Sequence, residues 1–125
     1  MFDNAGCPMG ARVLIVDDEP EILVAAVALF RMSGFEVLSA DNGMAAIQIL
    51  KRNAGIKLLL TDVLMPRMDG VTLGREARRL VPGIKVILVS GFPTFAMEVH
   101  EGKPEEFQFL LKPFLMSELA IVMRR

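Results

Sequence analysis

Four polar segments of the sequence carry side chains that could do chemistry, and each directly follows an apolar run. Asp17-Asp18-Glu19 follows the first run, and Asp62 follows the third. Ser90 comes after the fourth run and Lys112 after the fifth. A carboxylate can bind a cation or attack phosphorus, a hydroxyl can donate a hydrogen bond, and an ammonium can neutralise an anion. Whether these groups act together depends on how the apolar runs are arranged.

The apolar runs are typical of short strands that alternate with helices. They are Arg12 to Val16, Phe35 to Ser39, Lys57 to Thr61, Lys85 to Val89 and Phe107 to Leu111. The first, third and fourth contain continuous aliphatic stretches, as do strands covered by helices on both sheet faces. This pattern predicts an α/β fold with a doubly wound, five-stranded parallel sheet and helices on both faces. Ligands of such sheets bind outside the carboxyl ends of the strands, so the polar segments should share one edge.

Turn and capping residues predict the helices between these runs. The predicted helices cover Pro20 to Ser33, a segment capped by Asn42 and ending near Arg52, Val71 to about Leu80, a short helix within Thr94 to His100, and Phe114 to Met123. Proline suits the first turn of a helix, and Gly34 suits the left-handed position after its end.

The bulk composition indicates one folded domain. The chain has 125 residues, of which 53% are hydrophobic and 23% charged. We expect a flexible N-terminal arm over residues 1–10, followed by a domain over residues 11–125. The net charge of -1 provides no positive field for a nucleic acid, so we expect no direct nucleic-acid binding. One cysteine, Cys7, no apolar run long enough to span a bilayer and no secretory signal indicate a cytoplasmic protein that does not bind membranes.

Acids gathered at one sheet edge need a counter-charge, because clustered carboxylates repel one another. Mg²⁺ prefers oxygen ligands, keeps several waters and commonly takes one or two carboxylates together with phosphate oxygens. The acidic segments therefore favour Mg²⁺ as the cofactor.

Four motifs in order resemble the receiver domains of response regulators. They are Leu14-Ile15-Val16-Asp17-Asp18-Glu19-Pro20, the segment from Leu60 to Gly70 (LTDVLMPRMDG), Val89-Ser90-Gly91 and Leu111-Lys112-Pro113-Phe114. The resemblance covers about Ala11 to Arg125. It implies a flavodoxin-like sheet with strand order 2-1-3-4-5. It also implies a regulatory phosphoacceptor, with weak self-dephosphorylation rather than enzymatic turnover, that receives its phosphoryl group from a histidine kinase or a histidine phosphotransfer protein.

The resemblance also implies a set of metal-binding and acceptor residues. By it, Asp62 accepts the phosphoryl group and, with Asp18 and the backbone carbonyl of Leu64, ligates Mg²⁺. Asp17 holds the metal through water, and Lys112 neutralises the phosphoryl charge.

A switch is implied in the same way. Ser90 would donate its hydroxyl to a phosphoryl oxygen, and Phe109 would turn inward when that bond forms. The family tends to have a cis bond at Lys112-Pro113.

Two alternatives remain open at this point. An aspartyl-phosphate phosphatase would carry an Asp-x-Asp nucleophile motif on its first strand and needs a cap domain, neither of which fits this sequence. Receiver-like modules that are never phosphorylated usually lack one of the key residues, and none of them is missing here. The sequence does not indicate the output, and a phosphorylation-dependent homodimer is compatible with it.

Two further predictions concern the lifetime of the phosphoryl group and the docking of its donor. Leu64 and Phe92 offer no polar partner to a water that attacks phosphorus, which predicts slow self-dephosphorylation. On the first helix the only charged residues are Glu21 and Arg31. Placing Ile22, Ala26, Leu29 and Phe30 toward the sheet leaves three aliphatic residues outside as a partner-docking surface: Leu23, Val24 and Val27.

Overall fold

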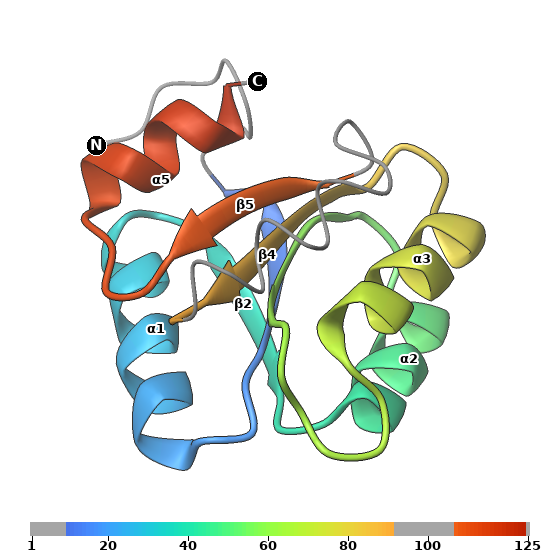
Figure 1. The fold of residues 1–125 in the computed structure, drawn as a ribbon. Helices are drawn as coiled ribbons and strands as arrows, with labels where there is room; N and C mark the ends of the chain where they lie inside the picture. Colours follow the sequence, from blue (N-terminus) through green and yellow to red (C-terminus); the bar gives the residue numbers. More distant parts are fainter. Residues whose placement is uncertain (1–9, 92–106, 125) are drawn as a thin grey trace.

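The computed structural model describes residues 10–91 and 107–124, in which strands and helices alternate (Figure 1). The strands are β1 (Arg12–Val16), β2 (Glu36–Ala40), β3 (Ile56–Asp62), β4 (Lys85–Ser90) and β5 (Gln108–Leu111). The helices are α1 (Pro20–Met32), α2 (Gly43–Arg52), α3 (Gly70–Leu80) and α5 (Met116–Met123). The predicted arm up to residue 9 and the predicted helix within Thr94 to His100 lie outside the described residues.

All five strands are parallel, and their order across the sheet is β2-β1-β3-β4-β5. The central strands β1, β3 and β4 are those with continuous aliphatic runs, since helices cover both of their faces. The register places Leu14 opposite Leu38 on one side and Leu59 on the other. The predicted fold class and strand order are therefore confirmed.

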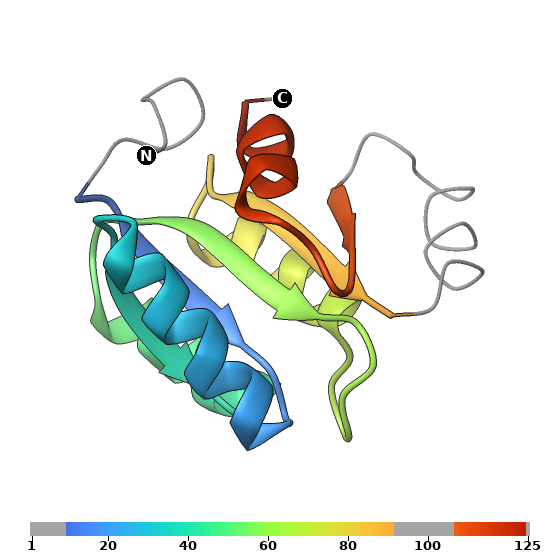
Figure 2. The ribbon, with the colours of Figure 1, turned by 90° about the vertical axis from the view of Figure 1, so that its left-hand side faces the viewer.

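Helices α1 and α5 cover one face of the sheet, and α2 and α3 cover the other (Figures 1 and 2). Successive residues of each central strand point to opposite faces, which divides the core into two clusters. Leu14, Leu59 and Leu88 belong to the cluster beneath α2 and α3. The other cluster joins the alternate strand residues to Phe30 of α1 and Leu119 of α5. Both helix layers are thus anchored to the strands that end at the polar edge.

Side-chain caps fix where three of these helices begin. The Asn42 side chain accepts the backbone N–H of Ala45 at 2.8 Å, and the Asp69 carboxylate accepts that of Thr72 at 2.8 Å. At α5 the Glu118 carboxylate accepts the backbone N–H of Leu115 at 2.9 Å. Each bond satisfies a donor exposed at a helix end. The last of them explains why α5 begins at Met116 rather than at the predicted Phe114.

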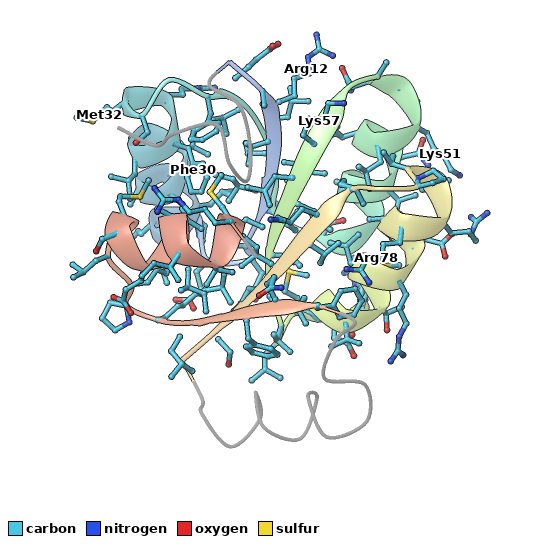
Figure 3. The ribbon with its side chains drawn as sticks, turned by 90° about the horizontal axis from the view of Figure 1, so that it is seen from above. Arg12, Phe30, Met32, Lys51, Lys57 and Arg78 are labelled. Atoms are coloured by element: carbon cyan, nitrogen blue, oxygen red, sulfur yellow. The ribbon has the colours of Figure 1, made fainter. Side chains whose placement is uncertain are left out.

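The edge where the strands begin carries cations (Figure 3). Arg12, the first residue of β1, forms an ion pair with Glu36 at 3.2 Å. The guanidinium of Arg78 lies 4.7 Å from the centre of the Phe107 ring, just before β5. The ammonium of Lys85 donates to the backbone carbonyl of Met123 at the end of α5. The first contact joins β1 to β2, and the other two hold β5 and α5 against the remainder of the domain.

Other element boundaries differ from the predictions by one or two residues. Strand β2 covers Glu36–Ala40 rather than Phe35 to Ser39, because Phe35 packs against Phe30 at a ring-centroid distance of 5.6 Å before the strand begins. No helix within the described ranges is long and apolar enough to cross a membrane.

Candidate functional site

The carboxyl ends of the central strands bring the predicted acids together. Asp62 is the last residue of β3, and Asp17 and Asp18 directly follow β1. One carboxylate oxygen from each of Asp17, Asp18 and Asp62 lies within 4.8 Å of the others. Strand order places β1 beside β3, so the close approach of these acids follows from the topology.

Lys112 provides a positive charge at this acidic cluster. Its Nζ lies 2.8 Å from Oδ2 of Asp17 and 3.2 Å from Oδ1 of Asp62. The backbone N–H of Lys112 donates to the carbonyl of Ser90 at 2.8 Å, and the Lys112-Pro113 bond is cis, as predicted. The Lys112 side chain is only 20% exposed, which strengthens its attraction to both carboxylates.

Both carboxylate oxygens of Asp17 already have partners. Oδ2 accepts from Lys112, and Oδ1 accepts the backbone N–H of Glu19 at 2.9 Å. Asp18 has no hydrogen bond or ion pair within the described part of the chain. This difference favours direct metal contact by Asp18 and a more distant role for Asp17.

The site shifts the pKa of its central carboxyl. Burial raises the pKa of Asp62, and the neighbouring charges of Asp17 and Asp18 raise it further. Lys112 opposes both effects, by charge and by hydrogen bonding, without cancelling them. Burial alone would lower the pKa of Lys112, but its contacts with Asp17 and Asp62 raise it overall, so the ammonium stays protonated. The cluster is therefore short of positive charge.

A pocket of about 230 Å³ opens beside the cluster. Its lining residues are Asp18, Glu19, Asp62, Leu64, Ser90, Gly91 and Lys112. Carboxylates, a hydroxyl and an ammonium around one such hollow suit a hydrated divalent cation together with an anionic group. The donor set therefore fits Mg²⁺, with Asp18 and Asp62 as the available side-chain ligands and the Leu64 backbone carbonyl in the adjoining loop.

The predicted switch residues lie on β4, which pairs with β3, and on the edge strand β5, which pairs with β4. Ser90 ends β4, where it is buried and faces the pocket. Phe109, on β5 opposite Leu88, is partly buried against the core cluster of α2 and α3. The structure thus places both residues between the pocket and the β5 edge of the sheet. Phe92, which we predicted to slow dephosphorylation together with Leu64, lies outside the described residues.

Gly70 is a site residue whose role the sequence did not reveal. Its backbone N–H donates to the carbonyl of Val63 at 2.8 Å. A Cβ on Gly70 would lie 2.2 Å from the backbone oxygen of Asp62, closer than any real contact. Only glycine lets α3 begin directly behind the acidic residue. In the sequence Gly70 directly precedes the helix predicted from Val71, but nothing in the sequence indicates this contact.

The predicted exposed surface of α1 is wrong for two of its three residues. Val24 is 69% exposed, but Leu23 and Val27 are partly buried against the core cluster that contains Phe30. Ala26 and Phe30 face the core as expected, whereas Leu29 is exposed. The helix is apolar on nearly every side, so two charged residues could not fix its rotation about its axis.

The exposed apolar side of α1 instead lines a groove. This groove has a volume of about 520 Å³ and is lined by Glu21, Ile22, Ala25, Ala26, Leu29, Lys112, Pro113 and Phe114. It runs between α1 and the segment that follows β5. Because Lys112 lines both the groove and the pocket, a partner seated in the groove would reach the acidic cluster.

Comparisons with known proteins agree with this geometry. The chain matches the family model of the response regulator receiver domain over residues 13–124. It is 36% identical over 115 residues to the sensor kinase CckA of Brucella abortus, covering 91% of this chain but 12% of that protein. It is 32% identical to the response regulator receiver protein CpdR of the same organism, covering 86% of this chain and 89% of CpdR. A receiver domain structure from Clostridium thermocellum superposes with a TM-score of 0.80 at 30% identity, covering 90% of each chain.

The charges around Asp62 predict opposite pKa shifts in two variants of the metal-free protein. Lys112→Met should raise the pKa of Asp62, because the ammonium favours the ionised carboxylate. Asp18→Asn should lower it, because a repelling charge is removed. Titration of the Asp62 carboxyl carbon by NMR would measure both. Lys57→Met, at the start of the same strand, is the matched control and should leave the value unchanged; equal shifts in all three variants would contradict the site described.

Proposed function

Because the chain belongs to the response regulator receiver domain family, we propose that Asp62 is its phosphoacceptor. Receiver domains are regulatory and take phosphoryl groups from histidine kinases or histidine phosphotransfer proteins. The observation that carries the assignment to Asp62 is its place within the acidic cluster, at 3.2 Å from Lys112 and on the wall of the pocket that also contains Ser90.

The proposed transfer forms one bond and breaks another. A carboxylate oxygen of Asp62 attacks phosphorus, and the bond from phosphorus to the donor imidazole breaks, with its electron pair returning to the imidazole nitrogen. Asp18, Asp62 and the Leu64 carbonyl would hold Mg²⁺ directly and Asp17 would hold it through water, and the ion would supply positive charge to the phosphoryl oxygens. Lys112 orients Asp62 and neutralises a further oxygen of the transferred group.

The proposed switch begins once the phosphoryl group is in place. The Ser90 hydroxyl donates to a phosphoryl oxygen across the pocket that both residues line. Movement of the β4 end then leaves space toward β5, into which Phe109 turns. Its partly buried position, packed on the cluster of α2 and α3, supports this role over that of a fixed core residue.

The groove beside α1 is the proposed docking site for the phosphohistidine donor. An apolar groove with a charged end suits an amphipathic helix, and its Lys112 end places the donor histidine next to Asp62. The docking residues are therefore Ala25 and Leu29, with Ile22 and Phe114, rather than Leu23 and Val27.

The near-neutral charge of the chain supports the absence of direct nucleic-acid binding. Three exposed residues support a phosphorylation-dependent homodimer: Leu111 on β5, Leu115 in the loop before α5 and Ile121 on α5.

Labelling with a small donor tests the phosphoacceptor. With Mg²⁺ and acetyl phosphate, the domain should gain one phosphoryl group, seen by intact mass spectrometry, and Asp62→Asn should gain none. Asp69→Asn is a matched control, because it keeps a capping side chain and should be labelled like the unchanged domain. Equal labelling of the Asp62→Asn variant would show that another residue accepts the group.

The lifetime of the phosphoryl group depends on Leu64. This side chain is 44% exposed and lines the pocket, where it offers no hydrogen bond to a water approaching phosphorus. Leu64→Asn should speed dephosphorylation on the order of tenfold by orienting that water. Leu64→Met, which adds no hydrogen-bonding amide, is the control. A decay followed by mass spectrometry that is unchanged or slower in the Asn variant would rule out this cause.

Docking and chemistry can be separated with two donors. The first donor is a histidine kinase that labels the unchanged domain. Ala25→Glu combined with Leu29→Lys should lower the rate of phosphotransfer from this kinase by about tenfold, a cost of about 1.4 kcal/mol. The rate with acetyl phosphate should stay the same. Val24→Glu, exposed on α1 but outside the groove, is the control. If it impairs transfer from the kinase and the groove variant does not, the docking face lies on the opposite side of α1.

A further inference from the structure

The loop between β3 and α3 contains a tight turn centred on Arg67. The backbone N–H of Met68 donates to the carbonyl of Pro66 at 2.8 Å, which closes a three-residue turn. Arg67, at its centre, has a φ of 70° and is the only described residue other than glycine with a positive φ. This conformation is rare and unfavourable for a residue with a Cβ. Glycine would suit the backbone better, so the arginine side chain needs its own explanation.

Arg67 lies beside the one carboxylate of the cluster that has no partner. A second hollow, of about 190 Å³, is lined by Asp18, Asp41, Asn42, Pro66 and Arg67. Asp41 accepts from the Asn42 side chain at 2.7 Å, whereas Asp18 accepts no hydrogen bond within the described part of the chain. Lys112 forms ion pairs with Asp17 and Asp62 and does not line this hollow.

The Arg67 side chain also lacks a polar partner among the described residues. It is exposed, and it forms no hydrogen bond or ion pair with any described residue. A guanidinium on a flexible stem that lines the same hollow as an unpartnered carboxylate reduces the repulsion within the acidic cluster, and this effect needs no fixed ion pair.

We propose that the positive charge of Arg67 partly neutralises Asp18 and thereby opposes the binding of Mg²⁺ to this carboxylate. Arg67 is thus a positioning residue that weakens Mg²⁺ binding and moves the metal requirement of phosphorylation to higher concentration. This inference rests on the proposed function only for its consequence on labelling, since the effect on the metal concerns Asp18 directly.

The effect is electrostatic, so it has a defined size and salt dependence. An exposed charge near a divalent cation changes its affinity by a few-fold, and salt screens the effect with a length of about 8 Å at physiological ionic strength. Lys57 is exposed on the same strand as Asp62, five residues away and at the opposite edge of the sheet. At about 3.3 Å per residue it lies well beyond that length. Loss of its charge is therefore a matched control.

Isothermal titration of the intact chain with MgCl₂ at physiological ionic strength, where the charge of Lys57 is screened, tests the proposal. Arg67→Gln should bind Mg²⁺ about threefold more tightly, and Arg67→Lys should bind like the unchanged protein. Lys57→Gln should also be unchanged. Arg67→Gly should match the glutamine variant in Mg²⁺ affinity while melting at a higher temperature, which separates the charge effect from the backbone effect. Added salt should bring the affinities of all these variants together.

A second measurement distinguishes this proposal from the proposed function. The Mg²⁺ concentration that half-saturates acetyl phosphate labelling should fall about threefold in Arg67→Gln. Tighter Mg²⁺ binding by this variant without labelling of any variant would support the role of Arg67 and contradict Asp62 as acceptor. Normal labelling of Asp62, with the same Mg²⁺ affinity in Arg67→Gln, Lys57→Gln and the unchanged protein, would overturn the role of Arg67.

Discussion

Three carboxylates with oxygens within 4.8 Å of one another repel, and the remainder of the site depends on how that repulsion is offset. Lys112 reaches two of them, at 2.8 and 3.2 Å, but the pKa of Asp62 still lies above its ordinary value. One ammonium is therefore insufficient. A divalent cation completes the charge balance, and an anionic phosphoryl group can then approach a carboxylate that would otherwise repel it.

The fold holds these charges together by placing them on rigid elements. Asp62 ends a strand that is buried between β1 and β4, and Gly70 lets α3 pack directly behind it. The helices end with cations at the opposite edge, such as Lys51 and Arg78, where they interact favourably with the negative ends of the helix dipoles. Most of the positive charge of the described chain is thus kept away from the acidic edge, which preserves its attraction for a metal ion.

The parts of the site that could be predicted are those fixed by strand topology. Continuous aliphatic runs identify β1, β3 and β4, and in a parallel sheet the residues that follow them must meet at one edge. Asp17, Asp62 and Ser90 were found in this way. Their roles were inferred from the resemblance to receiver domains, because spacing alone does not distinguish an acceptor from a ligand.

The parts that could not be predicted depend on contacts between loops and helices. Helix α1 is apolar on nearly all sides, so its rotation is set by packing on β1 and β2, and the inward placement of Leu23 and Val27 leaves no signal in the sequence. The left-handed turn at Arg67 likewise has no signal, since arginine does not favour that conformation. Gly70 gave a helix-start signal, but the close approach to Asp62 emerges only in three dimensions.

Anomalous scattering from crystals soaked in MnCl₂ would test the central claim most directly, because Mn²⁺ occupies oxygen-ligand sites of the kind that Mg²⁺ prefers. The account predicts one strong anomalous peak in contact with the carboxylates of Asp18 and Asp62 and next to the backbone carbonyl of Leu64. A peak elsewhere on the surface, with these carboxylates left without metal, would contradict it.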